Sequence, residues 1–347
     1  MSGISTQSTS ASRALELFGA YSPIALTAAL LALVPLRYSD SRTMMTVIII
    51  GMVFAAYTIA FNIILGSTGQ LFLCTGALAG IGGFTSAILT SKHGWPFIPS
   101  IVLGTLLASA IGGLLSWVAV RRSLDAIFTG VVTLAFSLSY ENLVLGRKDL
   151  TGGENGLRVK AAADTILTTR VAPYYVFLGL VVVYLVLYRL IERSHVGWAF
   201  RSLRDDEVAA ELSGVNVTRY RVYAGLIGSA MLGLAGALFA HNREFIAPTT
   251  FAFGAVDVRV LVMLVFGGIG SMLGPVIGAV ALTIVDEALV DFAQLRIMLY
   301  GIVIVVLFLG FRRGVVPSVA ALRERLTHLG RRSTPAAVKP PGSTPRS

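Results

Sequence analysis

The sequence predicts an all-α integral membrane protein with about ten transmembrane helices. Of the 347 residues, 55% are hydrophobic and only 13% are charged, whereas soluble domains carry about 25% charged residues. Its apolar segments approach the roughly 20 residues that a helix needs to cross the hydrocarbon core. Because most connections between these segments are short, we expect one transmembrane domain rather than two soluble domains.

Ten apolar segments are the predicted spans: residues 20–36, 44–65, 71–91, 97–120, 123–145, 173–191, 220–241, 251–267, 273–290 and 296–311. The first and last are short, and the eighth and ninth are interrupted by charge or by Gly and Pro, so these two are either full spans or partly re-entrant. Residues 1–19 are a predicted cytoplasmic tail. No clear small-residue cleavage site follows them, so the first apolar run is predicted to be a span and not a signal peptide. The transmembrane domain is then 20–311, and the basic tail 312–347 is predicted to be disordered.

The orientation follows from the basic residues. Cytoplasmic loops of membrane proteins collect Lys and Arg, so the Arg-rich C-terminal tail is placed inside. Alternating back through ten spans gives an N-in, C-in topology, with the long connection 146–172 outside and 192–219 inside. The formal charge of +10 then reflects topology, and no nucleic-acid partner is expected.

The sequence offers no motif for catalysis or metal binding. It contains no H-E-x-x-H and no G-x-S-x-G, its four His are scattered, and its single cysteine, Cys74, has no partner for a disulfide. It also lacks the G-x-x-x-x-G-K-[ST] loop that cradles phosphates. We therefore expect no enzyme, no catalytic residue, no metal and no cofactor, and ATP-driven work would need another polypeptide.

Glycine-rich breaks and polar residues within the spans mark a candidate pathway or hinge. Small residues let helices pack closely, but "GSTGQ" and "GGIGSMLGP" also break helices and expose backbone groups that protein or a wet cavity must satisfy. Asp257 and Arg259 are two residues apart and do not face each other on a helix, so each needs another partner or water. Asn62 and Gln70 either make hydrogen bonds between helices or line a pathway. The candidate residues are Asn62, Gly66, Gly69, Gln70, Asp257, Arg259, Gly267, Gly268 and Gly270.

A weak similarity links "FLCTGALAGIGG" in the third span with "FAFGAVDVRVLVMLVFGG" in the eighth. These spans face opposite ways in the predicted topology. Because inverted repeats are common in transporters, the similarity suggests a weak inverted repeat.

Residues 197–221 form a charge-dense, helix-prone segment between two apolar runs. Gly214 is placed to end a helix in the left-handed conformation, and Asn216 and Thr218 offer caps for the next span. We predict one short cytoplasmic helix, which is either a solvated loop helix or a contact surface whose small residues enter a groove and whose charges fix register on a partner. The residues predicted to contact that partner are Arg201, Arg204, Asp205, Asp206, Glu207, Ala209, Ala210, Glu211 and Gly214.

Four stretches carry a family resemblance: "NIILGSTGQLFLCTGALAGIGGF", "LTGGENGLRV", "GWAFRSLRDDEVAAELSGVNVTRYRVYAGLIGSAMLGLAGALFA", and "FIAPTTF" with "LVFGGIGSMLGPVIGA". In this order they resemble the permease subunits of branched-chain amino acid ABC importers, of the second-permease type, in a group that also contains urea and sugar permeases. Within the third stretch, Glu207, Ala209, Ala210 and Gly214 follow the E-A-A-x-x-x-G pattern of such permeases, with Val208 inserted. The resemblance covers residues 62–279. Phe72, where the family usually has Ser, and Arg259 depart from the pattern.

The resemblance implies a permease in a bacterial plasma (inner) membrane. It implies partners, namely a second permease subunit, two cytoplasmic ABC ATPases that bind ATP, and an extracytoplasmic substrate-binding protein. Residues 201–214 would be the coupling helix in the ATPase cleft. The surface for the binding protein would comprise Thr151, Gly152, Gly153, Glu154, Asn155 and Gly156. Urea or short amides are the alternative substrates, and a secondary transporter, a channel or a membrane scaffold are alternative classes.

Overall fold

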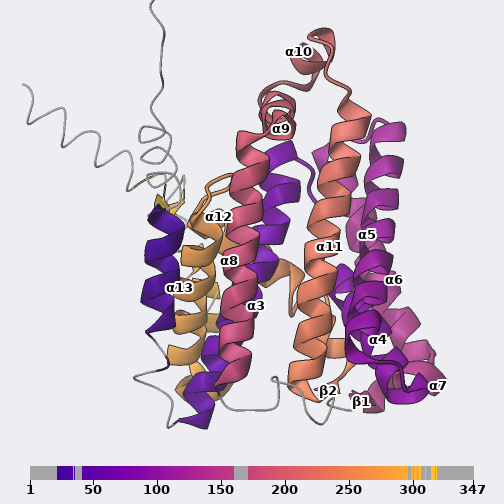
Figure 1. Cartoon of the computed structure of the whole chain (residues 1–347), viewed down its shortest axis with the longest axis vertical. Helices are drawn as coiled ribbons and strands as arrows, with labels where there is room; N and C mark the ends of the chain where they lie inside the picture. The colour runs from indigo at the N-terminus through magenta and orange to yellow at the C-terminus, as the bar shows by residue number, and fades with distance from the viewer. Residues whose placement is uncertain are drawn as a thin grey trace, which may run out of the picture.

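The computed structural model describes residues 22–33, 41–159 and 171–295, with isolated positions at 35 and between 298 and 318. This part of the chain is predominantly helical, as predicted (Figure 1). Five helices are long and apolar enough to cross a membrane: Thr43–Gly66, Phe97–Arg121, Ala126–Gly146, Ala172–Arg193 and Val217–Arg243. The count of ten spans, the N-in, C-in topology and the inverted repeat stay predictions, and the two tails and most of the span 296–311 lie outside the described residues.

An apolar helix, Ser22–Ala32, comes before the elements named next. In chain order these are α3 (Arg42–Phe61), the π-helical turn η1 (Asn62–Gly66), α4 (Thr75–His93), α5 (Phe97–Arg121), α6 (Ala126–Gly146), α7 (Lys148–Thr151), η2 (Gly153–Asn155), β1 (Leu157–Arg158), α8 (Ala172–Arg193), α9 (His195–Asp205), α10 (Glu207–Leu212), α11 (Val217–Arg243), β2 (Phe245–Ile246), η4 (Pro248–Phe251), α12 (Asp257–Gly267), α13 (Gly274–Ala288) and η5 (Val290–Leu295).

The helix α11 packs closely against α4 and α5 in the centre of the bundle. Small residues make this approach possible. A Cβ atom on Gly82 of α4 would collide with the backbone of Gly233 of α11, and one on Gly236 would collide with the backbone of Ala79. Close packing, the simpler of the two explanations for the glycines, therefore accounts for these positions.

Two helices begin inside the bundle rather than at its surface. The third and eighth predicted spans start at residues 71 and 251, but their helices α4 and α12 start only at Thr75 and Asp257. The preceding segments are irregular, since Gly69 has a φ of +72° and Pro248 opens a short 3-10 turn. The helical part of the eighth span is therefore only 11 residues long.

The described parts of the two long connections lie at opposite ends of the bundle (Figure 1). The helices α9 and α10 form one end. At the other end, β1 pairs with β2 in antiparallel fashion, with Leu157 opposite Ile246, and α7 lies beside them. The chain therefore presents two separate surfaces outside its apolar body.

Candidate functional site

The segment expected to be one helix is two helices that meet at Asp206. This residue has extended backbone angles, and its carboxylate accepts a hydrogen bond from the backbone N–H of Ala209 at 3.0 Å. An Asp side chain in this position satisfies an otherwise unpaired N–H in the first turn and so begins a new helix. The break between α9 and α10 is therefore a cap made by one of the predicted contact residues.

Several of the predicted contact residues hold α10 in place. Glu207 forms a two-pronged pair with Arg221 of α11, with both N–O distances at 2.8 Å. Ala210 is buried in a small cluster with Leu203 and Val217. These contacts fix the angle between α10 and α11.

Gly214 ends α10 as predicted, with a φ of +85°. Its N–H donates to the carbonyl of Glu211, and the N–H of Val215 donates to that of Ala210, which is the Schellman pattern. Asn216 caps α11 by accepting from the N–H of Arg219 at 2.9 Å, so Asn216 and not Thr218 is the N-cap.

The outward surface of this end combines apolar and charged side chains. Val208 and Leu212 are 67% and 85% exposed, and four residues apart they share one face of α10. Trp198 of α9 is also exposed, with the guanidinium of Arg201 4.8 Å from its ring centroid. The sequence analysis did not predict these exposed apolar residues, although the i, i+4 spacing of Val208 and Leu212 among charges indicates an apolar face on this helix. Exposed apolar side chains outside the membrane body are typical of a protein contact surface, to which Asp205, Ala209 and Glu211 add exposed neighbours.

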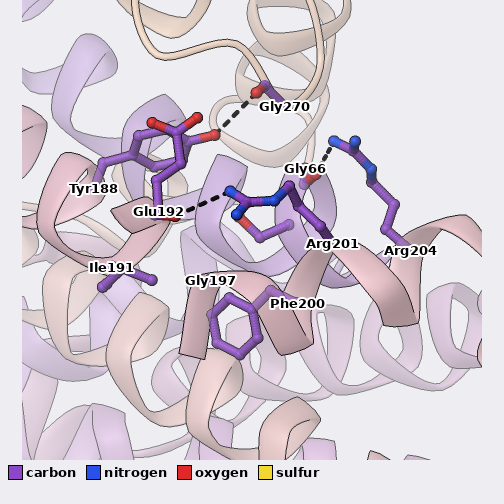
Figure 2. Close-up of a pocket in the computed structure, with 10 residues that line it drawn as sticks. Gly66, Tyr188, Ile191, Glu192, Gly197, Phe200, Arg201, Arg204 and Gly270 are labelled. Atoms are coloured by element: carbon purple, nitrogen blue, oxygen red, sulfur yellow. Dashed lines mark hydrogen bonds between the residues drawn. The ribbon is translucent and has the colours of Figure 1, made fainter. Parts of the chain in front are cut away.

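Beneath α9 lies a cavity of about 120 Å³ with both polar and apolar lining residues. Figure 2 shows Arg201 and Arg204 extending from α9 toward it, with Tyr188 and Glu192 of α8 on the opposite wall. The guanidinium of Arg201 donates to the backbone carbonyl of Glu192 at 2.9 Å, and that of Arg204 donates to the carbonyl of Gly66 at 3.1 Å. Both arginines thus anchor α9 to the bundle.

The two glycine-rich breaks of the sequence meet beside this cavity. The side-chain amide of Asn62 donates to the carbonyl of Ser271 at 2.9 Å and accepts from the N–H of Gly270 at 2.8 Å. The Tyr188 hydroxyl donates to the Gly270 carbonyl at 3.0 Å (Figure 2). The Asn62 side chain therefore bonds to the loop between α12 and α13. We call the group comprising Asn62, Gly66, Tyr188, Arg204, Gly270 and Ser271 the α9 junction.

The other residues of these breaks lie close by. The amide oxygen of Gln70 accepts from the Ser116 hydroxyl of α5 at 2.7 Å, which ties the irregular segment after η1 to that helix. Gly69, Gly268 and Gly270 have positive φ values. Gly267 has no room for a Cβ, which would collide with the backbone of Gly274.

A second polar group lies between the two ends of the bundle, where α4 and α12 both begin. The buried carboxylate of Asp257 accepts from the Thr75 hydroxyl at 2.7 Å, the Gly76 N–H at 3.1 Å and the Ser137 hydroxyl at 3.2 Å. The positive N-terminal ends of both helices favour the negative charge there. We call Asp257 with Thr75, Gly76 and Ser137 the Asp257 centre.

Arg259 has a different partner, as the two-residue spacing requires. Its guanidinium lies 3.5 Å from the carboxylate of Asp286 on α13 and 6.0 Å from the ring centroid of Phe54. Within the described residues, no group of three or more His, Cys, Asp or Glu side chains is placed to hold a metal ion.

At the opposite end, residues 151–156 form a tight loop. The Thr151 hydroxyl donates to the carbonyls of Val144 and Arg147, and Gly152, Gly153 and Gly156 all have positive φ. Thr151 and Gly153 are buried, while Glu154 and Asn155 are exposed. The glycines shape the loop, and Glu154 and Asn155 are its exposed residues.

The described residues form a helical bundle in which five helices are long and apolar enough to cross a membrane. The chain belongs to the family described as branched-chain amino acid transport system / permease component, whose model matches residues 17–311.

Curated relatives agree with this assignment. The high-affinity branched-chain amino acid transport system permease protein LivM of Salmonella typhimurium is 29% identical over 318 residues, which is 84% of this chain and 74% of LivM. LivM of Escherichia coli is 28% identical over the same shares. LivH of Escherichia coli, from the same transport system by its name, is 26% identical over 68% of this chain and 82% of LivH. No solved structure matches the chain.

Proposed function

We propose that this chain is the permease subunit of an ATP-driven importer that carries branched-chain amino acids across a bacterial inner membrane. The family match over most of the chain is the observation that carries this proposal. A second permease, two cytoplasmic ATPases and an extracytoplasmic binding protein complete the transporter. ATP is bound by the ATPases, because the chain has no phosphate-cradling motif of its own.

In this proposal α9 and α10 are the coupling segment. The exposed Val208 and Leu212 enter a groove of an ATPase, and Asp205 and Glu211 fix the register. Asp206, Glu207 and Ala210 act indirectly, by holding α10 at its angle to α11. Closure of the ATPases moves this segment, and the bundle opens to one side and then to the other.

The other end receives the substrate. Glu154 and Asn155 lie at the exposed tip of a loop that three glycines and the β1–β2 pair hold in one shape. A rigid tip suits the docking of a binding protein, since little conformational freedom is lost on contact. The polar residues between the two ends then belong to the path or to its supports.

The coupling segment is tested by making its apolar face acidic. Val208→Asp with Leu212→Asp is expected to abolish co-purification of the ATPases, while the amount of permease in the membrane stays unchanged. Leu150→Asp is the matched control, because Leu150 is also exposed but lies at the opposite end. Retention of the ATPases by the double variant would exclude this docking surface.

Transport itself is tested in proteoliposomes that contain the complete complex. Uptake of radiolabelled leucine is expected to require ATP and the binding protein, and to be inhibited by isoleucine and valine but not by urea. Equal leucine uptake without ATP hydrolysis would refute an ABC importer, and competition by urea alone would move the substrate to short amides.

A further inference from the structure

The α9 junction joins four segments, one of which is α8 with Tyr188. Asn62 and Gly66 form the π-helical end of α3, Gly270 and Ser271 lie between α12 and α13, and Arg204 belongs to α9. We propose, on the basis of the proposed function, that this junction transmits movement of the coupling segment to the two helix breaks. Arg204 and Tyr188 act as positioning residues in this step.

The hydrogen bonds of the junction act on main-chain atoms. Arg204 donates to the carbonyl of Gly66, Tyr188 donates to the carbonyl of Gly270, and the Asn62 amide bonds to both Gly270 and Ser271. A force applied through such bonds displaces the backbone itself rather than a mobile side chain. The α9 helix is therefore connected to the course of α3 and to the loop that joins α12 and α13.

The two helix breaks that the junction connects have backbone conformations that favour rearrangement. Residues 62–66 form a π-helical turn, a feature that is frequent at functional sites. Gly268 and Gly270 have positive φ, which glycine adopts without strain. The backbones of Gly66 and Gly270 also lie so close that a Cβ on Gly66 would be 2.9 Å from the Gly270 nitrogen. At Gly268 and Gly270 the loop between α12 and α13 can therefore change conformation without displacing a large side chain, whereas Ile63 and Ile64 keep the π-helical turn packed in the core.

The neighbouring cavity offers room for exchange of partners. It measures about 120 Å³ and is lined by Arg204, Tyr188 and the backbones of Gly66 and Gly270. A cavity of this volume with the polar groups of Arg204 and Tyr188 in its wall is large enough to admit water, which can take over a hydrogen bond when α9 moves. The junction can therefore open without leaving buried polar groups unpaired.

The opposing explanation is that these bonds only strengthen helix packing. Tyr184 provides a comparison, because it lies one turn earlier on α8 and its hydroxyl also donates to a backbone carbonyl, that of Met231, at 2.6 Å. That bond links α8 to α11 and reaches neither α9 nor the helix breaks. Loss of the Tyr184 bond thus affects packing but not the proposed link.

The experiment compares Tyr188→Phe with Tyr184→Phe in the complete complex reconstituted with the binding protein. Both variants lose one hydroxyl. We expect Tyr188→Phe to retain the ATPases and to hydrolyse ATP, but to import at least threefold less leucine per ATP. We expect Tyr184→Phe to import as much leucine per ATP as the parent complex, even if this variant is thermally less stable. Equal ratios for the two variants, or an unchanged ratio for Tyr188→Phe, would overturn the inference.

Arg204 provides a second measurement. Arg204→Ala should lower leucine transport per ATP, and Arg204→Lys should restore part of it, since lysine keeps a donor for the Gly66 carbonyl. An equal loss in both variants would contradict a role through this bond. If the parent complex itself shows no ATP-dependent leucine uptake, the proposed function fails. If the parent complex does take up leucine with ATP, but the Tyr188→Phe and Arg204→Ala variants import as much leucine per ATP as the parent, the proposed function stands and this inference fails.

Discussion

The Asp257 centre and the α9 junction both join segments that are far apart in sequence, but they do so by different means. The first places a buried carboxylate among three donors from α4 and α6. The second uses the neutral amide of Asn62, the Tyr188 hydroxyl and a partly exposed Arg204 on backbone atoms beside a cavity. A buried charge is costly to leave without its partners, whereas a hydrogen bond beside a cavity that admits water is readily exchanged. We therefore expect the Asp257 centre to stay rigid and the α9 junction to move during transport.

The largest expected effect comes from Asp257→Ala. This change leaves the Thr75 hydroxyl, the Gly76 N–H and the Ser137 hydroxyl without their common acceptor, and each buried donor left unsatisfied costs roughly 1–3 kcal/mol. We expect a large fall in the thermal unfolding midpoint of the detergent-purified permease, and less protein in the membrane.

Asp257→Asn is the matched control for that variant. The amide oxygen still accepts from Thr75 and Gly76, so we expect a smaller fall in the midpoint. Two equal falls would show that the negative charge itself, and not the hydrogen bonds that the side chain accepts, holds the two helix starts together. An unchanged midpoint in Asp257→Ala would remove the structural role assigned to the centre.

Gly66→Ala is expected to have an intermediate effect on stability and a strong one on transport. The added Cβ would collide with the amide oxygen of Asn62 and lie 2.9 Å from the Gly270 nitrogen. Such overpacking typically costs about 1–3 kcal/mol, and it pushes Asn62 away from Gly270. Leucine uptake should fall further than the amount of folded protein does.

Gly179→Ala on α8 is the control, because no atom lies within 4 Å of its added Cβ. It should leave both stability and uptake close to those of the parent. If uptake by Gly66→Ala falls only in proportion to folded protein, the α9 junction is a packing contact, and the contrast with the Asp257 centre disappears.

The Asp257 centre and the α9 junction also show which features of the site can be predicted from the sequence and which cannot. The apolar runs, the helix end at Gly214 and the importance of Asn62 and Asp257 follow from hydropathy, glycine chemistry and the cost of polar groups in a bilayer. The pairing of Asn62 with Gly270 does not follow, because two breaks 208 residues apart carry no signal of their contact in one sequence. Only the fold brings them together.

The contact residues of the coupling segment illustrate a second limit. Charge and small size suggested that Asp206, Glu207 and Ala210 face a partner, but these properties equally suit a cap, an ion pair and a close helix contact. The structure places them in those three roles. Asp206 could have been read as an N-cap from its position before a helix-forming run. The pairing of Glu207 with Arg221 depends on the angle between α10 and α11, which composition does not encode.

The smallest expected effect tests how the Asp257 centre divides its hydrogen bonds. Ser137 donates to the second carboxylate oxygen at 3.2 Å, a longer contact than the 2.7 Å bond from Thr75. Ser137→Ala should therefore cost about 1 kcal/mol, near the net value of an ordinary hydrogen bond, and lower the unfolding midpoint slightly. Ser139→Ala on the same helix removes only a local bond to the carbonyl of Ala135 at an exposed position, so it should leave the midpoint unchanged. A fall as large as that of Asp257→Ala would mean that Ser137, and not the two helix N-termini, stabilises the buried carboxylate, and the rigidity of the centre would then depend on α6.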